Sequence, residues 1–160
     1  MPSAYIETTV PSYYVARTSL NLLQVSRQAN TRVWWDSGCS GFDIYTSLEV
    51  IDEASVGDQE MVRMRLVLLE QAARLEITEE VGLLAQKLVT CGLIPAKAAS
   101  DAIHIAVASV HSMDYLVTWN FKHIANPFIR NRLRKVIQEF GFELPVLCSP
   151  DELLQYNEDN

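Results

Sequence analysis

Short apolar segments alternate along the chain with longer segments whose apolar side chains recur every three or four residues. The short segments favour buried strands, and we expect five of them, at residues 4–7, 42–45, 75–78, 115–119 and 145–148. The longer segments predict helices at residues 12–35, 46–54, 58–74, 78–91, around residue 101, at 128–140 and at 150–154. Strands that alternate with helices in this way indicate a parallel sheet with helices on both faces, the α/β class.

Local signals set several of the expected helix boundaries. Thr46, followed three residues later by Glu49, matches a capping box at the start of one helix. Thr78 is a suitable N-cap for another helix, which the pair Cys91-Gly92 should end. The small residues at 37–41 predict a break between the first helical region and the second strand.

The composition fits one ordinary domain. The chain has 160 residues, 49% of them hydrophobic, so we expect a single domain over residues 1–155 and a frayed tail at 156–160. No apolar run approaches the ~18 residues of a membrane span, and the first residues lack the pattern of a signal peptide. We therefore expect a cytoplasmic protein, and its three cysteines, which have no metal-binding spacing, should be free thiols.

Charge is distributed unevenly along the chain. The net charge of −7 argues against a protein that coats nucleic acid by charge alone. Residues 122–135 nevertheless contain five basic residues and no acid: Lys122, Arg130, Arg132, Arg134 and Lys135. This basic segment is either a solvated helix face, which charge alone favours, or a surface that brings an anionic substrate to a metal.

Three acids are candidates for one shared site, because ligands in open α/β sheets bind at the carboxyl ends of the strands. Glu7 ends the first expected strand. Glu53 lies in the helix after the second strand and has no local partner, unlike Glu49, which the capping box can use, and Asp52, which we expect in solvent. Asp101 lies on a helix of small and apolar residues, where an unpaired carboxylate is costly. Carboxylates that converge in this way suit Mg²⁺ or Mn²⁺.

Other candidates carry weaker arguments. Asn120 ends the fourth expected strand, and it is either a turn residue or a carbonyl ligand at the same edge of the sheet. His104 and His123 share no ligand spacing, so a zinc site is rejected, and Trp34-Trp35 fits the core better than a base-stacking platform. Phosphate-binding loop, dinucleotide-binding and serine-hydrolase motifs are absent from the sequence.

Four segments in order resemble the PIN domains of VapC-type toxins. They are Glu7-Thr8-Thr9-Val10, then Thr46-Ser47 with Glu53, then Ser100 to Ala106 (SDAIHIA), and Leu116 to His123 (LVTWNFKH). The resemblance spans about residues 4–148 and implies a three-layer α/β/α PIN-like domain with a parallel five-stranded sheet. It also implies metal-dependent cleavage of RNA phosphodiester bonds, a cognate antitoxin protein as partner and a homodimer.

The resemblance assigns roles to particular residues. Glu7, Glu53 and Asp101 would hold Mg²⁺ or Mn²⁺, and Asn120 would complete the catalytic set. Ser47 and Thr118 would support these residues, and three basic side chains would contact the RNA: Lys122, Arg130 and Arg134.

The chain differs from the commonest PIN pattern at two positions, where Glu7 and Asn120 replace aspartates. These differences favour, as an alternative, a PIN-like binding module with weakened or no activity. A metal-dependent phosphatase of small molecules is a third interpretation, since it would use the same acids, but the basic segment at residues 122–135 argues against it.

Overall fold

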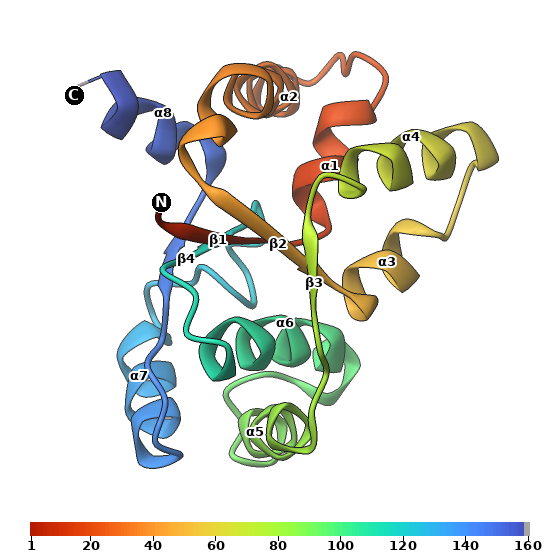
Figure 1. Ribbon diagram of the computed structural model, residues 1–160. Helices are drawn as coiled ribbons and strands as arrows, with labels where there is room; N and C mark the ends of the chain where they lie inside the picture. The colour runs from red at the N-terminus through yellow and green to blue at the C-terminus, as the bar shows by residue number, and fades with distance from the viewer. Residues whose placement is uncertain (159–160) are drawn as a thin grey trace.

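Five short parallel strands form the centre of the protein, in a computed structural model that describes residues 1–158. The strands are β1 (Ser3–Ile6), β2 (Asp43–Ser47), β3 (Ala73–Leu75), β4 (Tyr115–Val117) and β5 (Val146–Cys148). Their order across the sheet is β3-β2-β1-β4-β5, and every neighbouring pair is parallel (Figure 1). The α/β fold class and the parallel five-stranded sheet are thus confirmed.

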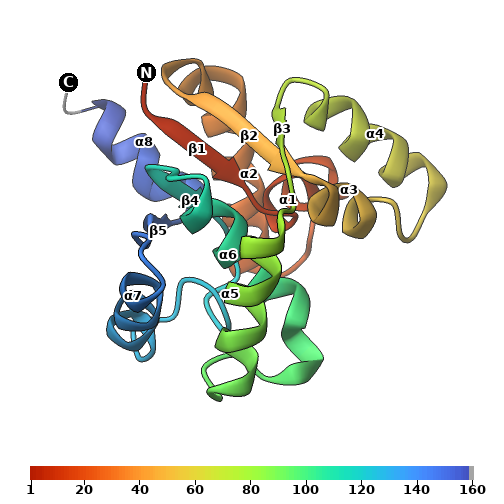
Figure 2. The same ribbon diagram turned by 60° about the horizontal axis from the view of Figure 1, so that its bottom comes forward.

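Helices cover both faces of this sheet, which gives three layers. Their bounds are α1 (Thr9–Val15), α2 (Leu22–Val33), α3 (Leu48–Ala54), α4 (Gln59–Leu69), α5 (Glu79–Thr90), α6 (Ala99–Val110), α7 (Arg130–Glu139) and α8 (Pro150–Glu158). In Figure 1, α5, α6 and α7 lie below the sheet, whereas α2 and α8 lie above it. Figure 2, turned by 60°, shows the five strands side by side, with α5, α6 and α7 on the nearer, lower side.

Successive side chains along each strand point to opposite faces of the sheet, so they pack into two separate apolar cores. Tyr5 of β1 and Leu116 of β4 point into the core formed with α5, α6 and α7. Their neighbours Ile6 and Val117 point into the other core, which contains the Trp34–Trp35 pair. Both tryptophans are buried, in agreement with the prediction that they belong to the core.

Several expected helix boundaries were wrong. The predicted helix at residues 12–35 is split into α1 and α2, and the predicted break at 37–41 lies in a π-helical turn (Trp34–Gly38) followed by a 3₁₀ turn (Cys39–Gly41). The predicted helix at residues 58–74 stops at Leu69, so that β3 can begin at Ala73 beside Tyr45.

The capping box was also wrong. Thr46 is a buried residue of β2, and Ser47 takes the N-cap position of α3 without a side-chain bond. Thr78, by contrast, accepts a hydrogen bond from Val81 N as expected, and Gly92 ends α5 with a φ of 82°.

The chain ends differ slightly from expectation. α8 extends through residues 156–158 of the predicted frayed tail, and residues 159–160 of that tail lie outside the described residues. Within the described part of the chain, no helix is both long and apolar enough to span a membrane.

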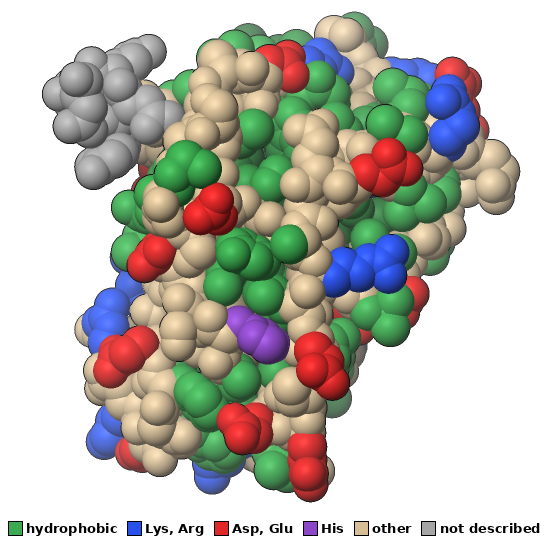
Figure 3. Space-filling view, viewed as in Figure 1, with side chains coloured by type: hydrophobic (Ala, Val, Ile, Leu, Met, Phe, Trp, Pro, Cys, Tyr) green, Lys and Arg blue, Asp and Glu red, His purple; other side chains and the backbone are tan. Residues whose placement is uncertain are grey.

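The surface seen in Figure 3 has no continuous basic patch among the side chains it colours by type. Basic side chains are few on this face, and several of them lie beside acidic ones. This face therefore offers no concentrated positive charge that would attract a polyanion.

Asp58→Ala should lower the free energy of unfolding by about 1 kcal/mol, because Asp58 caps α4 by accepting hydrogen bonds from Glu60 N and Met61 N. Urea unfolding of the wild type and the variant measures this difference. Asp52→Ala on α3 is the control: this exposed side chain caps no helix, so its removal should cost much less. Equal losses in the two variants would contradict the assigned cap.

Candidate active site

The candidate site lies where the direction of the sheet's connections reverses. From β1 the chain proceeds outward to β2 and β3, whereas β4 and β5 lie on the other side of β1. Such a switch point leaves a crevice beyond the carboxyl ends of the two central strands. Glu7 follows β1 directly and Thr118 follows β4 directly, so both project from the edge at which the sequence predicted a site.

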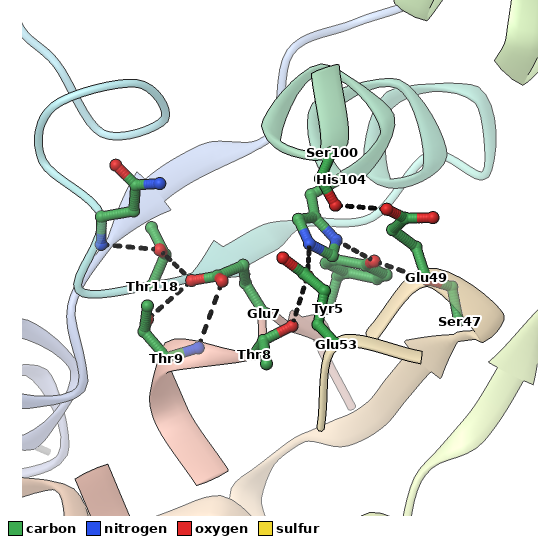
Figure 4. Close-up of polar contacts among 11 residues, drawn as sticks. Tyr5, Glu7, Thr8, Thr9, Ser47, Glu49, Glu53, Ser100, His104 and Thr118 are labelled. Atoms are coloured by element: carbon green, nitrogen blue, oxygen red, sulfur yellow. Dashed lines mark hydrogen bonds and ion pairs between the residues drawn. The ribbon is translucent and has the colours of Figure 1, made fainter. Parts of the chain in front are cut away.

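Glu7 is a buried carboxylate that the protein holds with three hydrogen bonds, as Figure 4 shows. Thr118 Oγ1 donates to Glu7 Oε1 at 2.5 Å and Thr9 Oγ1 donates to the same oxygen at 2.6 Å. The backbone N–H of Thr9 donates to the other oxygen at 3.1 Å. Only 3% of Glu7 is exposed, and burial raises its pKa, while the charge of His104 and the threonine bonds act in the opposite direction.

Glu53 approaches Glu7 from α3 and is held by groups from two other segments. Thr8 Oγ1 donates to Glu53 Oε1 at 2.7 Å, and His104 Nε2 bonds the same oxygen. Burial raises the pKa of Glu53, but the bond and the charge of His104, with the bond from Thr8, outweigh it and leave the pKa below its ordinary value. Glu53 is therefore the ionised partner of an imidazole.

His104 stands at the centre of the cluster and is completely buried. Burial lowers the pKa of His104, but the bond to Glu53 and the charge of Glu7 raise it by more, so the net shift is upward. In the protonated ring both nitrogens donate, Nε2 to Glu53 and Nδ1 to the Tyr5 hydroxyl at 2.7 Å. Tyr5 then donates its own proton to Ser47 Oγ, also at 2.7 Å.

This relay gives Ser47, the last residue of β2, a supporting place in the site. Burial raises the pKa of Tyr5, so its hydroxyl stays protonated and remains a donor. Beside the relay, Ser100 Oγ on α6 bonds Glu49, which therefore has a partner from a distant element instead of the one expected from the capping box. The labelled side chains of Figure 4 lie in one polar layer as three hydrogen-bonded groups, which are centred on Glu7, on Glu53 with His104, and on Glu49 with Ser100.

Asp101 lies in the first turn of α6, beside this layer. It is not one of the three residues whose ligand atoms lie closest together, which are Glu7, Glu53 and His104. Burial raises the pKa of Asp101, against a hydrogen bond from the Asn120 side chain and the charges of His104 and His123. The Asn120 carbonyl oxygen in turn accepts from His123 N at 2.9 Å. Asn120 therefore holds Asp101 with its amide N–H group, while its carbonyl oxygen is bonded to the backbone of His123.

The structure thus brings two of the three predicted acids into direct proximity. One oxygen of Glu7, one of Glu53 and a ring nitrogen of His104 lie within 4.8 Å of one another. Asp101 is coupled to them through the charges of Glu53 and His104. Thr118 and Ser47, for which the resemblance implied supporting roles, also lie within the layer.

A comparison with solved structures finds the same fold in a chain of VapBC2 from Rickettsia felis, which was solved bound to a DNA fragment from its promoter. The two chains superpose with a TM-score of 0.54 at 17% sequence identity, over 91% of this chain and 97% of the other. This chain has a PIN-like fold. No protein-family model matches the sequence, and no curated protein matches it either.

The basic residues proposed for substrate contact lie on or before α7 of this PIN-like fold. Lys122 and Arg134 are exposed, and Arg134 Nη1 donates to Asn131 at 3.2 Å. Arg130 is half-buried, and its Nε has no hydrogen-bond partner. None of the three forms an ion pair among the described residues, so their charges are free for an anion.

The donor set of the PIN-like site fits a hard divalent cation. Glu7 and Glu53 offer carboxylate oxygens at neighbouring positions, and Asp101 adds a third carboxylate beside them, as Mg²⁺ and Mn²⁺ prefer. The imidazole of His104 does not add a free ligand, since both of its nitrogens are bonded within the protein. In its protonated form the His104 ring instead lowers the pKa of both glutamates.

His104 is the residue whose role the sequence did not reveal. It stands three residues after Asp101, so the two share a helix face, but its partners come from β1 and α3. An isolated histidine in an apolar helix has no local signal for such contacts. Its burial between Tyr5 and Glu53 can be recognised only from the packing of α6 against the sheet.

Tyr5→Phe should lower the free energy of unfolding by about 1–3 kcal/mol, because it leaves His104 Nδ1 and Ser47 Oγ buried without this partner. Denaturant unfolding at neutral pH measures the change. Tyr14→Phe is the matched control, since it removes a hydroxyl whose bond to Asp36 is solvent-exposed, and it should cost no more than about 1 kcal/mol. A loss in Tyr5→Phe no larger than that of the control would contradict the relay.

Proposed function

We propose that this protein is a metal-dependent ribonuclease and the toxin of a toxin–antitoxin pair. The observation that carries the proposal is the convergence of Glu7 and Glu53 at the switch point of a PIN-like sheet, with Asp101 beside them. The similarity in fold to a chain of VapBC2 supports the same class, with an antitoxin protein as partner. A homodimer belongs to the proposal as well, and it rests on the resemblance of the sequence to PIN domains of VapC-type toxins.

In the proposed site, Glu7, Glu53 and Asp101 hold Mg²⁺ or Mn²⁺. The bound cation supplies an activated water and neutralises charge on the phosphodiester in the transition state. Thr9 and Thr118 fix the position of Glu7, and their hydrogen bonds to its carboxylate lower its pKa against the larger effect of burial. Asn120 fixes Asp101, and Lys122, Arg130 and Arg134 contact the RNA backbone.

His104 is the positioning residue of this proposal. It orients Glu53 through Nε2 while Tyr5 fixes the ring through Nδ1. The ring is buried, so it reaches no substrate, and it acts only through the carboxylate that it holds.

One feature of the site favours the alternative, a PIN-like module that binds a partner without catalysis. Glu53 is paired with His104 and Asp101 is bonded by Asn120, so part of the negative charge that would attract a cation is compensated within the protein. A module of this kind would keep the fold and the partner surface without needing a metal.

Asp101→Asn should reduce cleavage of structured and unstructured RNAs by at least about 100-fold with the fold intact, since loss of even an outer partner of a metal site costs 10- to 100-fold. Gel analysis of RNA fragments with Mg²⁺ or Mn²⁺, and with EDTA as a negative control, measures the loss. Asp52→Asn is the matched control, because Asp52 is exposed and lies one residue before Glu53. Full activity in Asp101→Asn, or activity that persists in EDTA, would contradict the proposal.

Mn²⁺ should bind the wild-type protein at a site that Glu7→Gln and Glu53→Gln weaken by at least about tenfold. Isothermal titration with Mn²⁺ alone measures the affinity without substrate. Asp52→Asn should again leave binding unchanged. Absence of Mn²⁺ binding in the folded wild-type protein would instead support the non-catalytic module.

A further inference from the structure

An arginine and two aromatic rings form a stack beside the acids that the proposed catalytic set does not use. The guanidinium carbon of Arg27 lies 5.3 Å from the ring centroid of Trp119 and 5.2 Å from that of Phe121. The two rings meet edge to face, with centroids 6.0 Å apart. Arg27 therefore sits in the corner between two rings, where cation–π attraction fixes its position.

The packing around Trp119 makes this stack rigid. Its indole Nε1 donates to Thr31 Oγ1 at 2.8 Å, and Thr31 lies one helical turn after Arg27 on α2. Tyr13 packs against the indole at a centroid distance of 5.8 Å. Trp119 is thus buried between α1 and α2, and only 6% of it is exposed. The indole is a support for its neighbours and offers no free face of its own.

Phe121 and Arg27 remain open to a ligand. Phe121 is 38% exposed, although a large aromatic side chain gains from burial. Arg27 is half-buried, and among residues 1–154, whose side chains are described, none gives its guanidinium a hydrogen bond or an ion pair. A cation that is fixed, planar and without an acidic partner suits a phosphate, to which its N–H groups can donate in pairs.

This stack is joined directly to the acids. The backbone N–H of Trp119 donates to Thr9 Oγ1 at 2.8 Å, and Thr9 Oγ1 donates to Glu7. Asn120, which holds Asp101, lies in the chain between Trp119 and Phe121. A ligand on Phe121 and Arg27 would therefore be a neighbour of the proposed scissile phosphate.

We propose that Phe121 and Arg27 form a nucleotide subsite for single-stranded RNA, with a base stacked on Phe121 and a phosphate bound by Arg27. The inference rests on the proposed function. A base can stack on a side chain only when it is unpaired and turned out of its own helix, so the subsite selects unstructured RNA. The net charge of −7 agrees with this, because a chain that repels polyanions needs stacking to gain affinity.

The test measures binding without cleavage, by fluorescence anisotropy of a labelled RNA with the full chain in EDTA. An unstructured oligonucleotide should bind more tightly than a blunt-ended RNA duplex, which offers no unpaired base. Phe121→Ala and Arg27→Gln should each weaken binding of the unstructured RNA by about tenfold, the scale of one stacked base or one charged contact. Arg27→Lys keeps the charge but loses the planar stack, and it should also bind more weakly.

Two matched variants serve as controls. Phe128 is 88% exposed but has no ring contact in the described structure, so Phe128→Ala should bind like the wild type. Arg74 is exposed on β3, at the edge of the sheet away from β4, so Arg74→Gln should also leave binding unchanged. Thermal unfolding of each variant checks that it is folded, and Arg27→Lys replaces Arg27→Gln if the latter is not.

A further variant separates stacking from a structural effect. Phe121→Trp keeps an aromatic face at this position and should retain binding, while the new indole fluorescence should be quenched by the RNA. Unchanged affinity in both Phe121→Ala and Arg27→Gln, or equal affinity for the blunt-ended duplex, would overturn the subsite.

The two proposals fail separately in these experiments. Binding that depends on Phe121 and Arg27, in a protein that cleaves no RNA with Mg²⁺ or Mn²⁺, would overturn the ribonuclease and retain the subsite. Cleavage with binding that is insensitive to both residues would retain the ribonuclease and overturn the subsite. Absence of both binding and cleavage would overturn both.

Discussion

The burial of one carboxylate at the end of the central strand is the constraint on which the site depends. Ile6 is part of the apolar core, and Glu7 follows it directly in the chain. The side chain of Glu7 therefore lies inside the protein and does not reach open solvent. A buried charge is costly unless other groups compensate it. The protein supplies two threonine hydroxyls, one backbone N–H and the charge of His104, and these groups come from the first residue of α1, the residue after β4, and α6. The positions of three elements are therefore fixed by a single acid.

The same compensation explains why the second acid can lie so close to the first. Two carboxylates a few ångströms apart repel each other, which would raise the pKa of at least one of them. His104 prevents this for Glu53, whose pKa is held below its ordinary value, so the strain of burial falls mainly on Glu7. A divalent cation at the same place would relieve Glu7 as well. The charge of His104 and the proposed cation would thus both offset the repulsion between Glu7 and Glu53.

The sequence predicted the layout of this site better than its contacts. Strand ends are encoded locally by short apolar segments, so the placement of Glu7 and Asn120 at the edge of a parallel sheet followed from pattern alone. The capping box at Thr46 failed because β2 continues through Ser47 to pair with β3, and Glu49 finds its partner, Ser100, on α6. Contacts of this kind join residues about 50 positions apart and leave no trace in local spacing.

The positive charges also differ in whether the sequence alone reveals them or only the contacts of the folded chain do. The basic segment at residues 122–135 is evident in the sequence, yet its side chains are mostly exposed and leave their function open. In the sequence, His104 and Arg27 are isolated basic residues. Their contacts form only when α6 and α2 pack against the strand ends. Each is fixed by neutral or aromatic groups as well as by charge: His104 by Tyr5, and Arg27 by Trp119 and Phe121. In an acidic protein, a few cations held in fixed positions supply local attraction that the molecule as a whole lacks, and recognition then depends on geometry more than on net charge.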